Sequence, residues 1–375
     1  MDLKLSEEEK LVRETAAQFV SRELIAREGR YLKQEESFLP PGDPPRRELD
    51  PEVRATLARV AKGIGLWALE LPPEADSPAP SAMARVLIYR EFGRTILPFA
   101  PPYIPALMAN HAHAEALADG EMSLALAFDQ IHKSGTPGGV ETRFRPTTEG
   151  YVLSNSDVEA LDPAVDLYLL PAREQGTNRV CLFLLRRDTR GFSIGDEVDL
   201  TTDSTVARLT LRDCRVPADA LIGYEYETAA IVASEQLRIA ARCLGIGMRC
   251  LADSIEHARN RITFGRPLAA RQSIQWMLAD LSIDLGTCTW LTLEAAWRAD
   301  QERPYFMAAA LAKKRAAKMA FEAADTAIQI HGGYGVCKEF PYEGFYREAR
   351  LLRLLYGREA ELDRAIGEKF LKAES

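Results

Sequence analysis

Helical hydrophobic spacing dominates the first zone of the chain, up to about residue 119. The segment 5–24 opens with Ser6 as a plausible N-cap and acidic residues in its first turn, an arrangement typical of a helix start. Similar patterns predict helices over 52–65 and 81–96, and the proline-rich stretch 40–51 predicts a loop. The apolar positions of the first segment recur at roughly helical spacing: Leu11, Ala16, Phe19 and Leu24.

A different pattern fills the second zone, residues 120–224. Short apolar runs alternate with turn residues, and this predicts strands over 149–160, 165–172, 179–187 and 205–216. We therefore expect a compact β domain, similar to a barrel.

The third zone, residues 225–375, returns to helical spacing. The positions of one apolar stripe are Leu237, Ala241, Leu244, Met248, Leu251 and Ile255, and a second stripe comprises Ile274, Leu278, Leu281, Leu285 and Cys288. Alanine-rich residues 304–330 predict a third long helix, followed by shorter ones over 344–352 and 359–371. The sequence thus predicts an α+β chain with an N-terminal helical domain (1–119), a middle β domain (120–224) and a C-terminal four-helix bundle (225–375).

Composition narrows the classes of partner and compartment. The net charge of -8 argues against nucleic acid as the main partner, since phosphate binding requires a basic face. The polar start MDLKLSEEEK does not resemble a signal peptide, and no apolar stretch is long enough to cross a bilayer. Six cysteines are scattered without the spacing of metal ligands. We expect reduced thiols, no metal site and a cytoplasmic protein.

Two connectors carry the most unusual chemistry. In QIHGGYGVCKEFPYEGFYREAR, from Gln329 to Arg350, Gly332 and Gly333 end the alanine-rich helix after His331, and glycines let a ligand approach the backbone closely. In HARNRITFGRPLAARQSIQ, residues 257–275, a cation, an aromatic ring and a flexible backbone join two helices. Taken alone, each of these two segments would be interpreted as an ordinary helix cap or turn.

Together these segments strongly resemble the C-terminal helical domain of the acyl-CoA dehydrogenase family. The resemblance covers about residues 230–370 well, the N-terminal helices fairly and the middle zone weakly. It implies FAD as cofactor, an acyl-CoA substrate and an electron-transfer flavoprotein or similar acceptor. It also implies a homo- or heterotetramer.

The resemblance assigns cofactor contacts residue by residue. Arg261 and Phe264 match the residues that meet the FAD of a neighbouring subunit, and Gln272 matches a contact to the same nucleotide. Gln329, Gly332 and Gly333 match the segment along the FAD diphosphate. A diphosphate needs a cation and close backbone N–H groups, so these residue types suit it.

The catalytic base departs from the commonest family pattern. Many members carry a glutamate late in the chain, where this sequence has Gly357 after Tyr356. Some members carry it on the first long bundle helix instead, where Glu235 falls. We expect Glu235 to be the base of α,β-desaturation. A solvated carboxylate near a helix start is the ordinary alternative. The residue after this glutamate is usually Arg in that subgroup and is Gln236 here.

The middle zone departs further. The family's Thr-Glu-Pro-Gly-like segment corresponds to AFDQIHKSGTPGG (127–139), and its flavin-contacting tryptophan is missing near Val158 and Glu159. Such loss resembles subunits of heteromeric and steroid-type acyl-CoA dehydrogenases. Three hypotheses follow: a dehydrogenase for a bulky or branched acyl group; a non-catalytic subunit completing a partner's FAD site; or a related flavin oxidase or monooxygenase. Small residues at Ala240, Ala241 and Gly245 are consistent with a wide acyl pocket.

Overall fold

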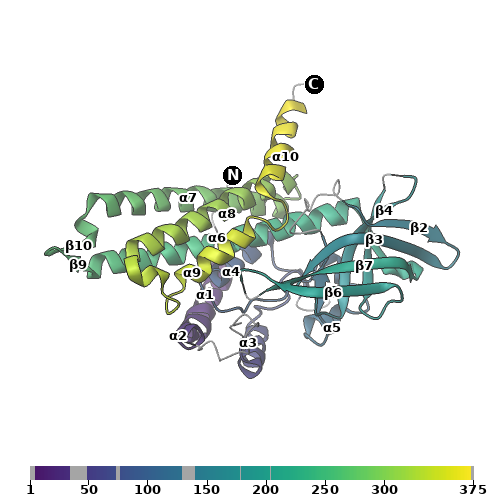
Figure 1. Cartoon of the computed structure of the whole chain (residues 1–375), viewed down its shortest axis with the longest axis horizontal. Coiled ribbons are helices and arrows are strands. Elements are labelled where there is room, and N and C mark those ends of the chain that lie inside the picture. The colour runs from purple at the N-terminus through teal and green to yellow at the C-terminus, as the bar shows by residue number, and fades with distance from the viewer. Residues whose placement is uncertain are drawn as a thin grey trace. The chain divides into compact units, whose positions relative to one another are not determined.

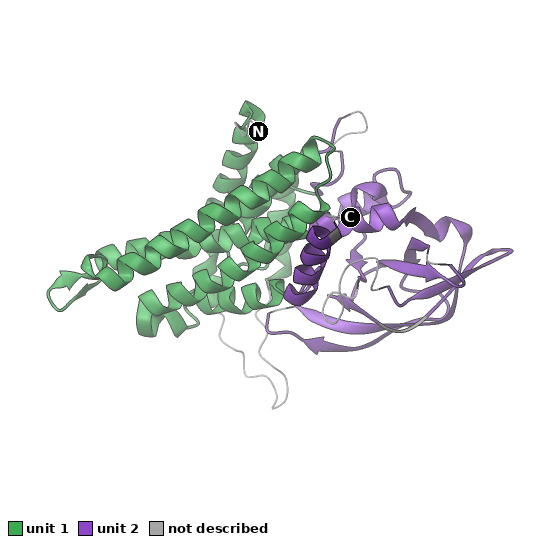
Figure 2. Ribbon diagram, turned by 90° about the horizontal axis from the view of Figure 1, so that it is seen from above, with its two compact units in different colours: residues 1–67, 80–102, 236–353 green, residues 68–79, 103–235, 354–375 purple. Residues whose placement is uncertain are grey.

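The computed structural model describes residues 5–33, 49–72, 77–128, 140–177, 179–202 and 204–372. Their contacts divide the chain into two compact units (Figure 2). Unit 1 comprises 1–67, 80–102 and 236–353, and unit 2 comprises 68–79, 103–235 and 354–375. The three-domain boundaries at 119/120 and 224/225 stay a prediction. Among the described residues, no helix is both long and apolar enough to span a membrane.

The N-terminal helices of unit 1 form largely as their sequence predicts. Ser6 and Glu9 make a reciprocal capping box at the start of α1. One expectation is wrong: Leu11 is 65% exposed, because it lies on the outer side of α1, whereas the other predicted apolar positions are buried. The elements are α1 (Glu7–Phe19), a π-helical turn η1 (Val20–Ile25), α2 (Ala26–Leu32), α3 (Pro51–Gly63) and α4 (Ala82–Phe92).

Long helices make up the rest of unit 1 (Figure 1). They are α6 (Glu225–Asn260, whose first residues belong to unit 2), α7 (Gln272–Asp300), α8 (Phe306–His331) and α9 (Tyr342–Leu352). The short elements between them are β9 (Ile262–Thr263), β10 (Arg266–Pro267), η5 (Leu268–Ala270) and η6 (Gly332–Val336). Of the predicted apolar stripe of α7, Leu281 and Cys288 are buried, whereas Ile274, Leu278 and Leu285 are only partly buried.

Close packing joins α4 to α6. A Cβ on Gly245 would lie 2.1 Å from the Arg90 carbonyl oxygen and 2.5 Å from the Gly93 Cα. Glycine is required there because the two backbones touch. Gly245 therefore gives no argument for a wide acyl pocket. Arg242 fastens the same region, donating to the Phe92 carbonyl at 2.6 Å and pairing with Glu348 at 2.5 Å.

Unit 2 is built on one sheet with strand order β6-β7-β3-β2-β4-β5-β8, and β1 pairs in parallel with β4. Inward side chains of six strands meet in one core that includes Phe144, Leu170, Phe183 and Leu209. The strands are β1 (Leu124–Leu126), β2 (Arg143–Thr147), β3 (Gly150–Leu161), β4 (Leu167–Glu174), β5 (Val180–Arg186), β6 (Phe192–Asp199), β7 (Thr205–Val216) and β8 (Leu221–Tyr224).

Short helices complete unit 2: η2 (Ala106–Met108), α5 (Ala114–Ala118), η4 (Ala218–Ala220) and α10 (Glu359–Lys372). The α+β architecture of N-terminal helices, a middle sheet and C-terminal helices confirms the predicted fold class.

Candidate functional site

A tight hairpin closes the connector between α6 and α7. Thr263 pairs with Arg266, and the two residues between them, Phe264 and Gly265, have φ of 48° and 76°. Positive φ at both central residues defines a type I′ turn, which places Phe264 at the tip. Its ring is 97% exposed, and the Arg271 guanidinium lies 5.7 Å from the ring centroid.

Exposed polar side chains flank this hairpin. Arg261 follows the end of α6, and Gln272 is the first residue of α7. Both side chains are exposed, and the Arg261 guanidinium has no carboxylate within 4 Å among the described residues. The sequence predicted only a connector between two helices over residues 257–275; the hairpin within it was not predicted.

The end of α8 lies beside the end of α6. The helix ends at His331, and Gly332 follows with φ 61°, a conformation that side chains rarely adopt. The His331 and His257 rings are 4.3 Å apart, centroid to centroid. Gly332 and Gly333 are exposed, with open space where a Cβ would stand, and Gln329 is exposed one turn earlier.

The elements that carry the predicted cofactor-binding residues, namely the β9–β10 hairpin, the start of α7 and the end of α8, lie toward the same end of the helices in Figure 1. Together they offer one cation, two amides, two glycines and one aromatic face, all toward solvent. This donor set fits an anionic dinucleotide with an aromatic ring system, since guanidinium and backbone groups suit phosphate and the ring suits stacking. The residues present thus fit FAD, and their exposure fits a nucleotide presented by another chain.

Glu235 lies in α6 and is 1% exposed. Its neighbour Gln236 is also buried. Burial disagrees with the ordinary alternative of a solvated carboxylate at a helix start. Few carboxylates are fully buried unless they are paired or functional.

Gly357 is built into its turn. It has φ 112°, and a Cβ there would lie 2.7 Å from a Leu362 methyl carbon. Tyr356 before it also has positive φ, 50°, and packs against Phe128. A glutamate at this position would be strained whatever its role, so the turn has no place for the commoner base.

The middle-zone segments give little support for a complete flavin-ring site. Residues 129–139, most of the Thr-Glu-Pro-Gly-like segment, lie outside the described residues. Val158 is buried in the sheet core opposite Leu209, and Glu159 pairs with Arg208 in register. The stretch where the tryptophan was expected is therefore a strand with an aliphatic residue, Val158, in the sheet core.

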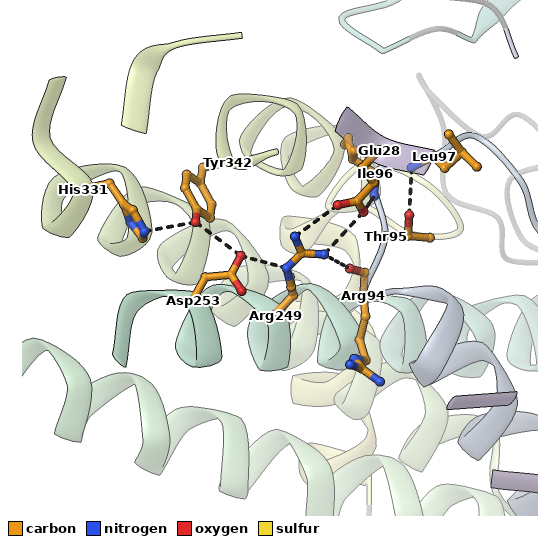
Figure 3. Close-up of polar contacts among 9 residues, drawn as sticks. All are labelled: Glu28, Arg94, Thr95, Ile96, Leu97, Arg249, Asp253, His331 and Tyr342. Carbon is orange, nitrogen blue, oxygen red and sulfur yellow. Dashed lines mark hydrogen bonds and ion pairs between the residues drawn. The ribbon is translucent and has the colours of Figure 1, made fainter. Parts of the chain in front are cut away.

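Sequence reasoning missed a partly buried polar network behind the Gly332 turn. It joins His331 to Tyr342, Asp253 and Arg249, and it is shown in Figure 3. The only sequence signal was polar residues within otherwise buried helices. Tyr342 and Asp253 are 89 positions apart, so no local spacing could pair them.

Comparison with known proteins agrees with this architecture. The family description "Acyl-CoA dehydrogenase, C-terminal domain" matches residues 223–371. An acyl-CoA dehydrogenase of Bacillus subtilis is 30% identical over 265 residues, covering 68% of this chain and 70% of that protein. The (R)-benzylsuccinyl-CoA dehydrogenase of Thauera aromatica is 26% identical over 99% of this chain and 97% of its own.

A solved structure shares the fold over almost the whole length. The ChsE4-ChsE5 complex of Mycobacterium tuberculosis aligns with a TM-score of 0.81 at 21% identity, covering 99% of each chain.

Proposed function

The chain belongs to the acyl-CoA dehydrogenase family, and on that premise we propose that it removes the α-proton of an acyl-CoA thioester with Glu235 as base. It is an oxidoreductase of this family, and FAD is its cofactor. When bound, FAD accepts the hydride that leaves the β-carbon. The product is the α,β-unsaturated thioester.

The observation that carries the proposal is the burial of Glu235 together with the unsuitable turn at Gly357. General base catalysis requires a positioned carboxylate shielded from water. Of the two positions at which the family carries its base, this chain has a carboxylate at one and a strained glycine at the other. Glu235 is therefore the residue that we assign to the role.

At the end of the bundle, the chain's own residues hold the nucleotide. Arg261 would offer its guanidinium to the diphosphate, and backbone groups at Gly332 and Gly333 would approach it with no side chain between them. Phe264 offers an exposed ring, while Gln272 and Gln329 offer amides. Because all six are exposed, we infer that they serve the FAD of a neighbouring subunit.

An exposed apolar row on α7 supports assembly of several chains. Trp276, Ile283 and Trp290 are 61%, 66% and 61% exposed and are spaced seven residues apart. Such a row on one helix face is typical of an interface. We propose a tetramer, and the ChsE4-ChsE5 complex supports a partner of related fold as one of its forms.

Within the acyl-CoA thioesters that the family uses, we propose a narrower class of substrate for this chain. We propose a bulky or branched acyl group. The support is the likeness over nearly the full length to a relative named for benzylsuccinyl-CoA.

A second candidate is a non-catalytic subunit that completes the FAD site of a related chain. The observation favouring it is Val158, which is packed in the sheet core where the family has a tryptophan against the flavin. Glu235 would then be dispensable for turnover.

The test is to replace Glu235 by Gln and to assay the protein, alone and co-expressed with related dehydrogenase chains, against a panel of acyl-CoA thioesters. We expect Glu235→Gln to lower kcat by at least 10²-fold with unchanged FAD content. The matched control is Glu225→Gln, an exposed glutamate at the start of the same helix. Unchanged turnover in both variants would favour the structural subunit.

A visible absorption spectrum of the chain purified alone separates the two forms of assembly. One FAD per chain would indicate a self-sufficient oligomer. A colourless protein that acquires FAD only beside a related chain would indicate a shared site.

A further inference from the structure

Five polar side chains form one continuous hydrogen-bonded network behind the Gly332 turn, with Glu28, His331 and Tyr342 buried and Arg249 and Asp253 partly buried (Figure 3). His331 Nε2 lies 3.0 Å from the Tyr342 hydroxyl, which lies 3.2 Å from Asp253 Oδ2. Arg249 Nε donates to the same Asp253 oxygen at 2.7 Å, and Arg249 Nη2 donates to Glu28 Oε2 at 3.0 Å. The network thus connects the end of α8 with α9, α6 and α2.

The number of hydrogens that these five side chains share depends on the protonation state of His331. Nδ1 of His331 lies 2.7 Å from the Ala327 carbonyl oxygen, which only accepts, so Nδ1 carries a hydrogen. In the neutral ring Nε2 is then an acceptor. The Tyr342 hydroxyl has a single hydrogen and faces two acceptors, Nε2 and Asp253 Oδ2. When His331 is neutral, either Nε2 or Asp253 Oδ2 therefore receives no hydrogen bond from Tyr342.

When His331 is protonated, both hydrogen bonds of the Tyr342 oxygen can form. Nε2–H then donates to the Tyr342 oxygen, and the Tyr342 hydroxyl donates to Asp253. The charges also balance: two carboxylates (Glu28 and Asp253) and one guanidinium (Arg249) sum to -1, which an imidazolium brings to zero. A buried polar network is most stable when every member is paired.

The surroundings of His331 have opposite effects on its pKa. Burial lowers its pKa, whereas its bond to Ala327 and the charge of Asp253 act in the other direction. From α6, His257 lies against its ring, and its pKa is lowered by burial, His331 and Arg261. From α9 the facing group is Tyr342, while Tyr334 and Lys338 beyond the turn are exposed. Burial is the larger effect, so in the FAD-free protein the pKa of His331 is lowered and the neutral ring is favoured.

We propose that Tyr342 is a positioning residue that, with Asp253, holds a proton on His331 Nε2, and that FAD binding at the adjacent Gly332–Gly333 turn takes up this proton. The inference rests on the proposed function of that turn. The diphosphate brings two negative charges next to His331, and such charge favours the imidazolium. The imidazolium in turn adds a cation beneath the turn, so nucleotide and proton bind cooperatively.

Linkage gives the expected pH dependence. Between the His331 pKa of the FAD-free protein and that of the FAD-bound protein, the Kd for FAD rises with pH by up to tenfold per unit. Outside that window the dependence on this group vanishes. Tyr342→Phe removes both the acceptor for Nε2–H and the donor to Asp253. The pH range between the two His331 pKa values should therefore become narrower.

The direct measurement is the pKa of His331 in the assembled protein, with FAD and after FAD has been stripped. Hydrogen–deuterium exchange at the histidine C2 position, read by mass spectrometry of the His331 peptide, reports it without using activity. We expect a higher pKa with FAD. This increase in the pKa of His331 should be smaller in Tyr342→Phe. It should be unchanged in Tyr346→Phe, because the Tyr346 ring packs on Phe321 and takes no part in the hydrogen-bonded network.

Calorimetry counts the protons independently. FAD binding to the stripped protein, measured in buffers of different ionisation enthalpy, should show uptake approaching one proton per FAD within the window. The wild-type comparison needs no variant, so a Tyr342→Phe protein that fails to fold does not remove the test.

Two results would overturn the inference, and they are distinguishable. If Arg261→Ala weakens FAD binding but the His331 pKa is the same with and without FAD, the proton coupling is wrong and the site stands. If Arg261→Ala and Gln329→Ala leave FAD binding unchanged, the assignment of the turn fails and the inference fails with it.

Discussion

At the scale of single residues, two positions bear on the base that we propose. Gly357 occupies a left-handed conformation against Leu362, so the turn cannot accept the family's commoner glutamate without strain. Glu235 is buried in α6 instead. Relative to family members that have glutamate at this position, Gly357 thus differs in backbone conformation as well as in side chain.

Gly357→Glu tests this reading. We expect the free energy of unfolding to fall by about 1–3 kcal/mol, from the positive φ and the overlap with Leu362, without any gain in dehydrogenase activity. Urea unfolding measures the first and a thioester assay the second. Gly367→Ala in α10 is the control, since that position is helical and open, and alanine there should be neutral or stabilising. Activity restored to Glu235→Gln by Gly357→Glu would contradict the prediction.

A single thiol reports on the nucleotide turn. Cys337 is exposed, and its thiol donates to the Gly333 carbonyl oxygen at 3.3 Å, whereas the other five cysteines are buried. Burial raises the pKa of Cys214 and Cys288 to about 11 and raises that of Cys243 and Cys250 further, so these thiols stay unreactive.

We expect an aromatic disulfide reagent to label one cysteine quickly in the FAD-free chain and all six after unfolding. Bound FAD should slow the fast reaction by shielding the turn. Cys337→Ser should remove it. Fast labelling that is equal with and without FAD would speak against nucleotide binding at Gly332–Gly333.

At the scale of elements, the hydrophobic pattern predicted most of the fold. The helix ending at His331 and the strand-rich zone ending at Tyr224 are where the pattern changes, because periodicity follows which face is buried. The exposed Leu11 and the hairpin around Phe264 were missed. A single apolar residue at helical spacing does not reveal whether a partner element covers it, and a two-residue turn needs only a local pair of left-handed residues.

The candidate site was predictable only in part. Arg261 and Gly332 lie in recognisable segments, and the structure brings those segments together through the His257–His331 contact. Tyr342 and Arg249 could not be predicted, because their roles depend on partners far away in the sequence. Tertiary packing creates such pairs, and no local spacing records them.

The outer face of α7 gives a prediction about assembly. Replacing Trp276 and Trp290 together by Gln should shift the oligomer to smaller species, measured by sedimentation, with unchanged helix content, because both rings are mostly exposed in the chain itself. Leu11→Gln, which removes an equally exposed apolar side chain from α1, should leave the mass unchanged. An unaltered mass in the double variant would show that α7 is not the interface.

At the scale of the whole molecule, the acid stability of unit 1 depends on two histidines at the end where we propose that the nucleotide binds. His331 and His257 both have pKa values lowered chiefly by burial. The unfolded chain therefore binds protons at a higher pH than the folded chain. For such groups the stabilisation is complete above the unfolded pKa of about 6.5 and is lost as pH falls through the folded value.

The FAD-free protein should accordingly lose stability on acidification from about pH 6.5. Each such histidine contributes at most about 1.4 kcal/mol per pH unit to the slope of the free energy of unfolding. His331→Gln should flatten that slope, as measured by urea unfolding at a series of pH values. His113→Gln, in unit 2, serves as the comparison and should leave the contribution of unit 1 intact. A slope in His331→Gln as steep as in the wild type would mean that His331 does not titrate in this window. If the proposed coupling holds, bound FAD should flatten the wild-type slope, because it raises the pKa of His331 in the folded protein. Acid stability and cofactor binding would then both depend on His331 at the end of α8.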